Sequence, residues 1–294
     1  MKQAVSVSLG SDIRDASAEI ELLGQKLLLR REGWNGSVDQ VTARFTELDG
    51  QVDALGVGGI DLWVYSASRK YPLNSAHKLI KQVKHTPVVD GSGLKHTLER
   101  QTAAVVAGVT DKKRVLIVSA LDRIGMTQSF FENGFEVLCG DGAFALGIPL
   151  KIRSLAGLSR LASVFLPIVS RLPIHMIYPT GDSQNTIVPK YEDWYSWADI
   201  IAGDCLYIKK HLPDSLAGKI IVTNTTTQAD RDAFRQRGVT TIITTTPVID
   251  GRSFGTNLFE AGLTAVAGKG RPLVQAELEE IIRELGLKPT IVDR

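Results

Sequence analysis

The sequence predicts an α/β protein made of two domains, and three observations support this prediction. The chain has 294 residues, more than one average domain contains, and its 44% hydrophobic and 22% charged residues are typical of a globular protein. Short apolar runs that read as buried strands, such as 115–118, alternate with segments of helical period. Glycine, Asp and Asn follow most of these runs. Because strand and helix alternate, we expect parallel sheets with helices on their faces.

Residues 1–108 form the predicted N-terminal α/β domain, which we expect to bind substrate. The expected strands are Ala4–Leu9, Lys26–Arg31, Val52–Val57 and Pro87–Val89. The expected helices are Ser17–Leu23, Val38–Leu48 and Ser75–Lys84. A longer helix over 94–108, with apolar residues in a helical period, is predicted to bridge to the next domain.

Residues 109–256 form the predicted second domain, which opens with the segment Arg114–Asp141. This segment reads as a strand, the turn Ser119–Met126, a helix over 127–133 and a second strand. Further strands are expected at 198–202, 219–223 and 240–244, so the domain is predicted to be a Rossmann-like, doubly wound sheet. Residues 257–294 are predicted as helices that cross back, and the cleft lies between the domains.

The turn Ser119–Met126 has the position of a dinucleotide-binding loop but not its sequence. With Gly125 as the last glycine of G-x-G-x-x-G, Ala120 and Asp122 occupy the first two glycine positions. The Asp122 carboxylate would lie near a diphosphate, and Arg123 could offset its charge. The alternatives are a different ligand, or a turn that only caps the helix. The candidate NADP or NAD contacts are Ser119, Ala120, Asp122, Arg123, Gly125, Met126, Asp141, Asn224, Thr225 and Thr246.

Polar residues at the carboxyl ends of the predicted strands are the candidates for chemistry, because ligands bind there in open α/β sheets. Lys95 and Asp90 are the candidate catalytic pair, a Lys and an Asp that could shuttle a proton. Glu99 shares a helix face with Lys95, and Lys70 is the rival lysine. The candidate substrate contacts are Ser92, Arg252 and Asn257.

Composition argues against several classes of partner. The net charge of +2 is too small to indicate nucleic acid. The five His residues lack metal-ligand spacing, and two Cys residues make no disulfide framework. No apolar run is long enough to span a bilayer, so a cytoplasmic protein is expected. The basic, apolar segment Ser154–Leu172 reads as a helix interrupted at Pro167. The aromatic segment Tyr191–Trp197 and the terminal helix are compatible with a homodimer.

The order of elements resembles the two-domain dehydrogenases of the shikimate or quinate, methylene-tetrahydrofolate and glutamyl-tRNA reductase type. Three motifs more closely resemble bacterial proteins labelled quinate or shikimate 5-dehydrogenase-like. They are Val89–Lys95, Ser119–Met126 and Arg252–Asn257. The resemblance implies a substrate domain, a Rossmann domain that binds NAD(P), and a Lys and Asp pair that shuttles the proton during oxidation of an alcohol by the cofactor. The local motif around that pair does not match residue by residue, so Lys95 and Asp90 are candidates by position.

Three functions follow as hypotheses. The first is an NAD(P)-dependent oxidoreductase that transfers hydride to or from a small hydroxy or keto substrate similar to quinate or shikimate. The second is a ligand-binding protein or a non-redox enzyme whose dinucleotide loop has degenerated, and Asp122 is its main support. The third is an acyl-thioester reductase with Cys205 as its nucleophile, although Asp204 beside it would work against a thiolate.

Overall fold

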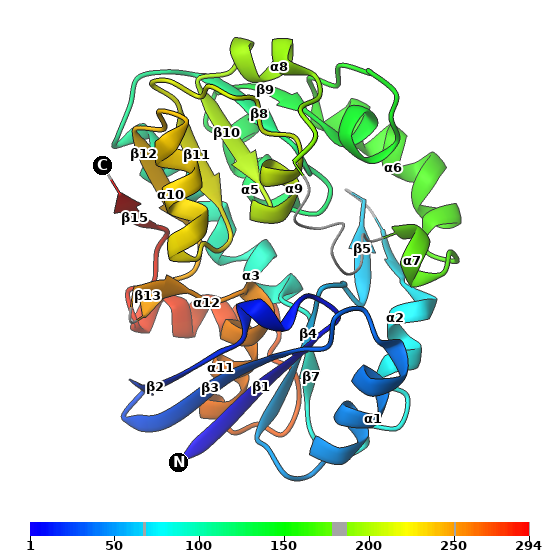
Figure 1. The fold of residues 1–294 in the computed structure, drawn as a ribbon. Helices are drawn as coiled ribbons and strands as arrows, with labels where there is room; N and C mark the ends of the chain where they lie inside the picture. Colours follow the sequence, from blue (N-terminus) through cyan, green and yellow to red (C-terminus); the bar gives the residue numbers. More distant parts are fainter. Residues whose placement is uncertain (67–68, 178–186, 250, 294) are drawn as a thin grey trace.

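The computed structural model describes residues 1–66, 69–177, 187–249 and 251–293. The chain forms two lobes, each built around its own sheet, and Figure 1 shows the first lobe below the second. Parallel strands dominate both sheets, so the predicted α/β class is confirmed.

The first sheet has five strands in the order β2-β3-β1-β4-β7. Their bounds are β1 Lys2–Ser8, β2 Ala16–Leu22, β3 Gln25–Gly33, β4 Ala54–Gly58 and β7 Val88–Val89. Strand β2 pairs antiparallel with β3, and the other neighbours are parallel. A separate two-stranded sheet joins β5 Trp63–Tyr65 to β6 Lys70–Pro72.

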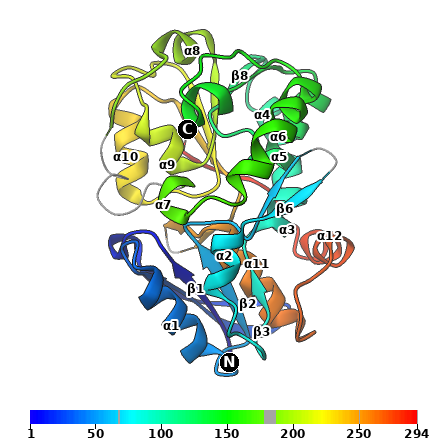
Figure 2. The same ribbon diagram turned by 90° about the vertical axis from the view of Figure 1, so that its right-hand side faces the viewer.

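Both faces of the first sheet are buried. Successive side chains of a strand point to opposite faces, so Ala4 of β1 joins one hydrophobic cluster while Val5 and Val7 join another. Helices α1 Val38–Leu48 and α2 Asn74–Leu79 cover the Val5 face. Helices α11 Thr256–Ala267 and α12 Gln275–Glu284 cover the other face. The late helices therefore cross back onto the first lobe, as Figure 2 shows for α11.

The second sheet has six strands in the order β15-β12-β11-β10-β8-β9. Their bounds are β8 Arg114–Ile117, β9 Glu136–Cys139, β10 Ile200–Gly203, β11 Ile220–Thr223, β12 Thr241–Thr244 and β15 Thr290–Asp293. All are parallel except β15, which pairs antiparallel with β12. Among the described strands, one (β9) lies outside β8, whereas the 3-2-1-4-5-6 order of dinucleotide-binding sheets has two strands there.

Helices also cover both faces of the second sheet, because Val115 and Ile117 of β8 belong to one cluster and Leu116 to another. These helices are α4 Thr102–Ala107, α5 Ile124–Glu132, α6 Leu155–Val169, α8 Glu192–Trp197, α9 Cys205–Lys210 and α10 Gln228–Gln236. Helix α7 Ile174–Ile177 instead packs on the first lobe, where Ile174 joins the cluster of Val5. The shorter elements are η1 Asp12–Arg14, η2 Leu98–Gln101, η3 Asp141–Ala145, β13 Val248–Ile249 and β14 Arg252–Ser253. In the part of the chain described, no helix is both long and apolar enough to cross a bilayer.

Two predicted helices are wrong. Of the predicted helix Ser17–Leu23, residues 17–22 belong to β2, because Ala18, Ile20 and Leu22 alternate with polar residues at the two-residue period of a strand. The bridge over 94–108 is not one helix: it is α3 Ser92–His96, then η2, then α4. The helical path breaks at Thr97, whose backbone leaves the helical region at φ −120° and ψ −77°.

The basic segment Ser154–Leu172 and the aromatic segment Tyr191–Trp197 both pack as parts of the fold. Pro167 lies inside α6 near its end and does not divide the helix. The aromatic segment packs into the second lobe, where Trp194 and Tyr195 are buried and contact the ring of Phe144. Core packing within one chain therefore accounts for this aromatic cluster.

Candidate functional site

A cavity of about 180 Å³ lies between the two lobes. From the first lobe it is lined by Ser8 and Gly58, which end β1 and β4. From the second lobe it is lined by Asp204 and Asn224, which directly follow β10 and β11. The carboxyl ends of both sheets therefore open onto one cavity, the usual position of a ligand in open α/β sheets.

Lys95 is the central cation of this cavity. Its side chain extends from the short helix α3 and is only 6% exposed. The Nζ donates to both Asp61 carboxylate oxygens at 2.8 Å and to Asp122 Oδ1 at 2.7 Å. Asp61 follows β4 in the first lobe, whereas Asp122 lies in the turn after β8 in the second. One ammonium group thus holds a carboxylate from each lobe.

The two carboxylates bound to Lys95 have opposite pKa shifts. Burial is the largest cause for Asp61 and raises its pKa to about 8, although the charge of Lys95 opposes the change. Burial acts in the same direction on Asp122, but the charges of Arg123 and Lys95 outweigh it and hold its pKa well below the usual range. Asp61 is therefore the member of the pair that can exchange a proton near neutral pH.

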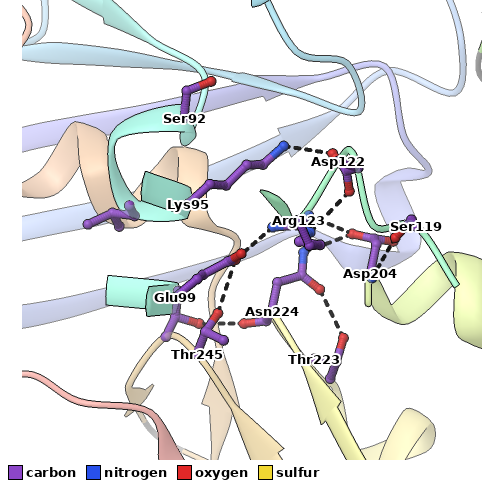
Figure 3. A network of polar contacts seen from close by, with 12 residues as sticks. Ser92, Lys95, Glu99, Ser119, Asp122, Arg123, Asp204, Thr223, Asn224 and Thr245 are labelled. Atoms are coloured by element: carbon purple, nitrogen blue, oxygen red, sulfur yellow. Dashed lines mark hydrogen bonds and ion pairs between the residues drawn. The ribbon is translucent and has the colours of Figure 1, made fainter. Parts of the chain in front are cut away.

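Arg123 forms a second buried cation beside the first. Its guanidinium lies 2.9 Å from Glu99, 3.0 Å from Asp122 and 2.9 Å from Asp204, with the side chain 5% exposed. Figure 3 shows Arg123 among these carboxylates, with Asp122 also bound to Lys95. Asn224 donates to Asp204 at 2.8 Å and extends the network to the end of β11. The network therefore joins the bridge to three turns of the second lobe.

Asp90, the predicted partner of Lys95, makes other contacts. Its carboxylate accepts backbone N–H groups from Leu62 at 2.7 Å, Trp63 at 3.2 Å and Ser92 at 2.9 Å. The Lys95–Asp90 pair is thus corrected: the carboxylates that bind the ammonium are Asp61 and Asp122. Asp90 lines the cavity but fixes backbone, since its oxygens satisfy three amides.

The predicted cofactor residues are only partly brought together. Asp122, Arg123, Asn224 and Thr225 line the cavity. The others of that set are absent from its lining among the described residues: Ser119, Ala120, Gly125, Met126, Asp141 and Thr246. Thr246 is fully buried, and its hydroxyl donates to backbone oxygens of Asn224 and Phe254. Its role is therefore to hold the strand ends together.

The loop after β8 does not fit a dinucleotide diphosphate. The Asp141 carboxylate accepts the N–H groups of Ala120 at 3.0 Å and Leu121 at 2.9 Å, so a protein anion already binds amides of this loop. Burial raises the pKa of Asp141 to about 6. A Cβ at Gly125 would lie 1.8 Å from the carbonyl oxygen of Lys95, so this glycine permits close packing on α3. Both features use the loop for contacts within the protein.

Of the predicted substrate residues, some line the cavity and one does not. Arg252 and Asn257 line the cavity, and Asn257 donates its Nδ2 to Ser6 Oγ at 2.6 Å. Ser92 is buried, is absent from the described lining, and its Oγ has no hydrogen-bond partner among the described residues. Two of the three candidates therefore reach the place where a ligand would lie.

The remaining candidates are weaker. Lys70 is exposed and lies over the ring of Trp63 at 4.4 Å. Cys205 is 1% exposed, and burial, the largest cause, raises the pKa of its thiol well above the usual value. In the described ranges no group of three His, Cys, Asp or Glu residues is placed to hold a metal ion. Lys95 with Asp61 and Asp122 is the strongest chemical arrangement.

The chain belongs to the family described as Domain of unknown function (DUF8754), whose model matches residues 93–293. A second family model, Domain of unknown function (DUF8753), matches residues 3–90, so the two models meet at the turn between β7 and α3. No curated protein matches the chain.

Two solved structures are similar at low identity. One is a periplasmic ribose ABC transporter from Conexibacter woesei DSM 14684, with 11% identity over 96% of this chain and 94% of that chain and a TM-score of 0.36. The other, from Mycobacterium smegmatis, has 13% identity over 98% and 96% of the two chains and a TM-score of 0.31.

Proposed function

We propose that the chain is a non-redox enzyme that moves a proton on a small hydroxy or keto compound bound between the lobes. The observation that carries this proposal is the Lys95 ammonium held between Asp61 and Asp122 at the cavity wall. A carboxyl group whose pKa is about 8 and a buried cation beside it are the two groups that such chemistry needs.

The reaction class that fits these groups is proton abstraction next to a carbonyl. Ionised Asp61 accepts the proton from the carbon, and the electrons of the broken C–H bond form the enolate double bond. The enolate oxygen carries the resulting negative charge, which Lys95 stabilises as it develops. The hydroxyl proton on the adjacent carbon then moves to the enolate oxygen, and Asp61 returns its proton to the former carbonyl carbon. The old carbonyl becomes a hydroxyl and the old hydroxyl becomes a carbonyl, so an isomerisation is complete and no electron acceptor is needed. Asp122 stays ionised and fixes the position of Lys95.

An NAD(P)-dependent oxidoreductase is the second candidate. Two observations favour it. Residues 114–132 form a strand, a turn and a helix, and the sequence resembles quinate or shikimate dehydrogenase-like proteins. The Asp141 carboxylate on the loop amides opposes it. Titration of the protein with NADP and with NAD by calorimetry separates the candidates. We expect no binding heat at millimolar cofactor, and saturable binding of either cofactor would favour the oxidoreductase.

Exchange of carbon-bound hydrogen for deuterium tests the proposed reaction directly. A panel of small hydroxy and keto acids and their phosphate esters, incubated in D2O, is followed by proton NMR for loss of the signal next to the carbonyl. We expect exchange with the natural sequence, at least 100-fold slower exchange with Asp61→Asn, and no change with Lys70→Met. Exchange that persists in Asp61→Asn would contradict the role of this carboxyl.

A further inference from the structure

We propose that the wall of the cavity formed by Arg14, Arg31 and Arg252 is a subsite for a phosphate monoester. All three arginines line the same cavity as Lys95. They come from three separate elements, η1, β3 and β14. The inference rests on the proposed function in one respect, since it names the substrate of that reaction as phosphorylated.

The ion pairs of Arg14 and Arg31 leave positive charge uncompensated. Arg31 binds Asp15 at 2.6 Å, and Arg14 lies 3.2 Å from Asp230. Asp230 is shared, because Lys209 also contacts it at 2.5 Å. Both arginine side chains are held in place, with exposed fractions of 15% for Arg31 and 18% for Arg14. Asp15 and Asp230 are therefore paired with three cations: Arg14, Arg31 and Lys209.

Arg252 adds a further positive charge without a carboxylate in contact. Among the described residues no ion pair to it is formed; its guanidinium donates to the backbone oxygens of Arg14 and Asp15. Its Nε is buried and has no hydrogen-bond partner in the described part of the chain. Burial lowers the pKa of Arg31 to about 10, and the nearby charges of Arg14 and Arg252 contribute to the lowering. The cluster thus has an excess of positive charge and an unused donor.

A phosphate monoester is the ligand that matches this excess. Three arginines and Lys209 face Asp15 and Asp230, which leaves two positive charges over, and a phosphate monoester carries nearly two negative charges at pH 7. Planar guanidinium groups bind phosphate oxygens in pairs of parallel hydrogen bonds. The cavity of about 180 Å³ is small for a ligand site, so we expect a small ligand. The substrate class is a phosphorylated hydroxy or keto compound of a few carbons.

Binding of inorganic phosphate and of phosphoglycolate, measured by calorimetry, tests the subsite without any catalytic assay. We expect saturable binding of both, with affinity at least about tenfold weaker in Arg252→Gln, because a charge-assisted contact is lost. Arg44→Gln is the matched control, since Arg44 pairs with Glu32 and Glu47 in the same lobe and does not line the cavity among its described residues. Its phosphate affinity should equal that of the natural sequence.

Three results would overturn the proposal: no phosphate binding, equal losses in Arg252→Gln and Arg44→Gln, or malonate bound as tightly as phosphate. The third would indicate a carboxylate subsite. Lys95→Met separates this test from that of the proposed function. It should retain phosphate binding even though it loses proton transfer, so the two proposals can fail independently.

Discussion

Replacement of Lys95 by Met removes the charge that holds two buried carboxylates together. Methionine preserves much of the side-chain volume, so the main change is loss of the ammonium and its contacts to Asp61 and Asp122 at 2.7–2.8 Å. Removing one partner of a buried ion pair costs up to about 3–5 kcal/mol. Because Asp122 keeps its contact with Arg123 at 3.0 Å, we expect a cost of about 3 kcal/mol here. For a chain of this size the melting temperature should fall by about 10 °C.

Urea unfolding followed by tryptophan fluorescence and circular dichroism measures this cost. Lys70→Met is the control, because Lys70 is exposed, and it should change stability by no more than about 0.5 kcal/mol. Adding Asp61→Asn to Lys95→Met should recover about 1–2 kcal/mol, since a buried amide, unlike the Asp61 carboxyl, does not have to take up a proton when the chain folds. A cost below about 1 kcal/mol, or no recovery in the double variant, would refute the view that these groups act as one buried network.

Three further predictions follow from the same region. Because the folded pKa of Asp61 is about 8 and its ordinary value is 3.8, the folded state binds the extra proton between these pH values, and stability should fall as pH rises from 6 to 8. Asp61→Asn should reduce that fall by about 1–2 kcal/mol in urea unfolding, and an unchanged slope would contradict the shift. Gly125→Ala should cost about 3 kcal/mol because its Cβ would meet a backbone oxygen at 1.8 Å, whereas Gly157→Ala, with its nearest atom at 3.2 Å, should cost less than about 1 kcal/mol. Cys205 should resist iodoacetamide in the folded protein and react fully in urea, as mass spectrometry would show; rapid reaction of the folded protein would revive the thioester hypothesis.

The strands were the part of the fold most accessible from sequence. Runs such as Ile220–Thr223 are buried on both faces, so they read as continuous apolar segments. The strand β2 was missed because the segment was read as a short helix although its apolar and polar residues alternate; of its apolar face only Ala18 is fully buried, and Ala16, Ile20 and Leu22 are partly buried. The break at Thr97 depends on contacts between α3 and the second lobe, which a local helical period does not contain.

The site was predictable where residues follow strands and unpredictable where separate turns meet. Asp122, Arg123 and Asn224 were predicted as cofactor contacts because each lies at or near the end of a predicted strand, and all three line the cavity. Asp61 was missed: it follows Gly58-Gly59 in a stretch read as extended, and its importance depends on Lys95, 34 residues later. The arginine cluster combines η1, β3 and β14, and no sequence spacing relates these three elements.

The contacts of the loop after β8 favour the proposed proton transfer over dinucleotide binding. In a dinucleotide-binding loop, the glycines let backbone approach the diphosphate. Here the same positions face protein: Gly125 packs on the Lys95 carbonyl, Asp122 binds the Lys95 ammonium, and the amides of residues 120 and 121 bind Asp141. Each contact joins the loop either to the bridge or to its own lobe. The loop therefore positions Asp122 against Lys95, as the proposed acid–base site requires, while Asp141 occupies two of the amides that a diphosphate would need.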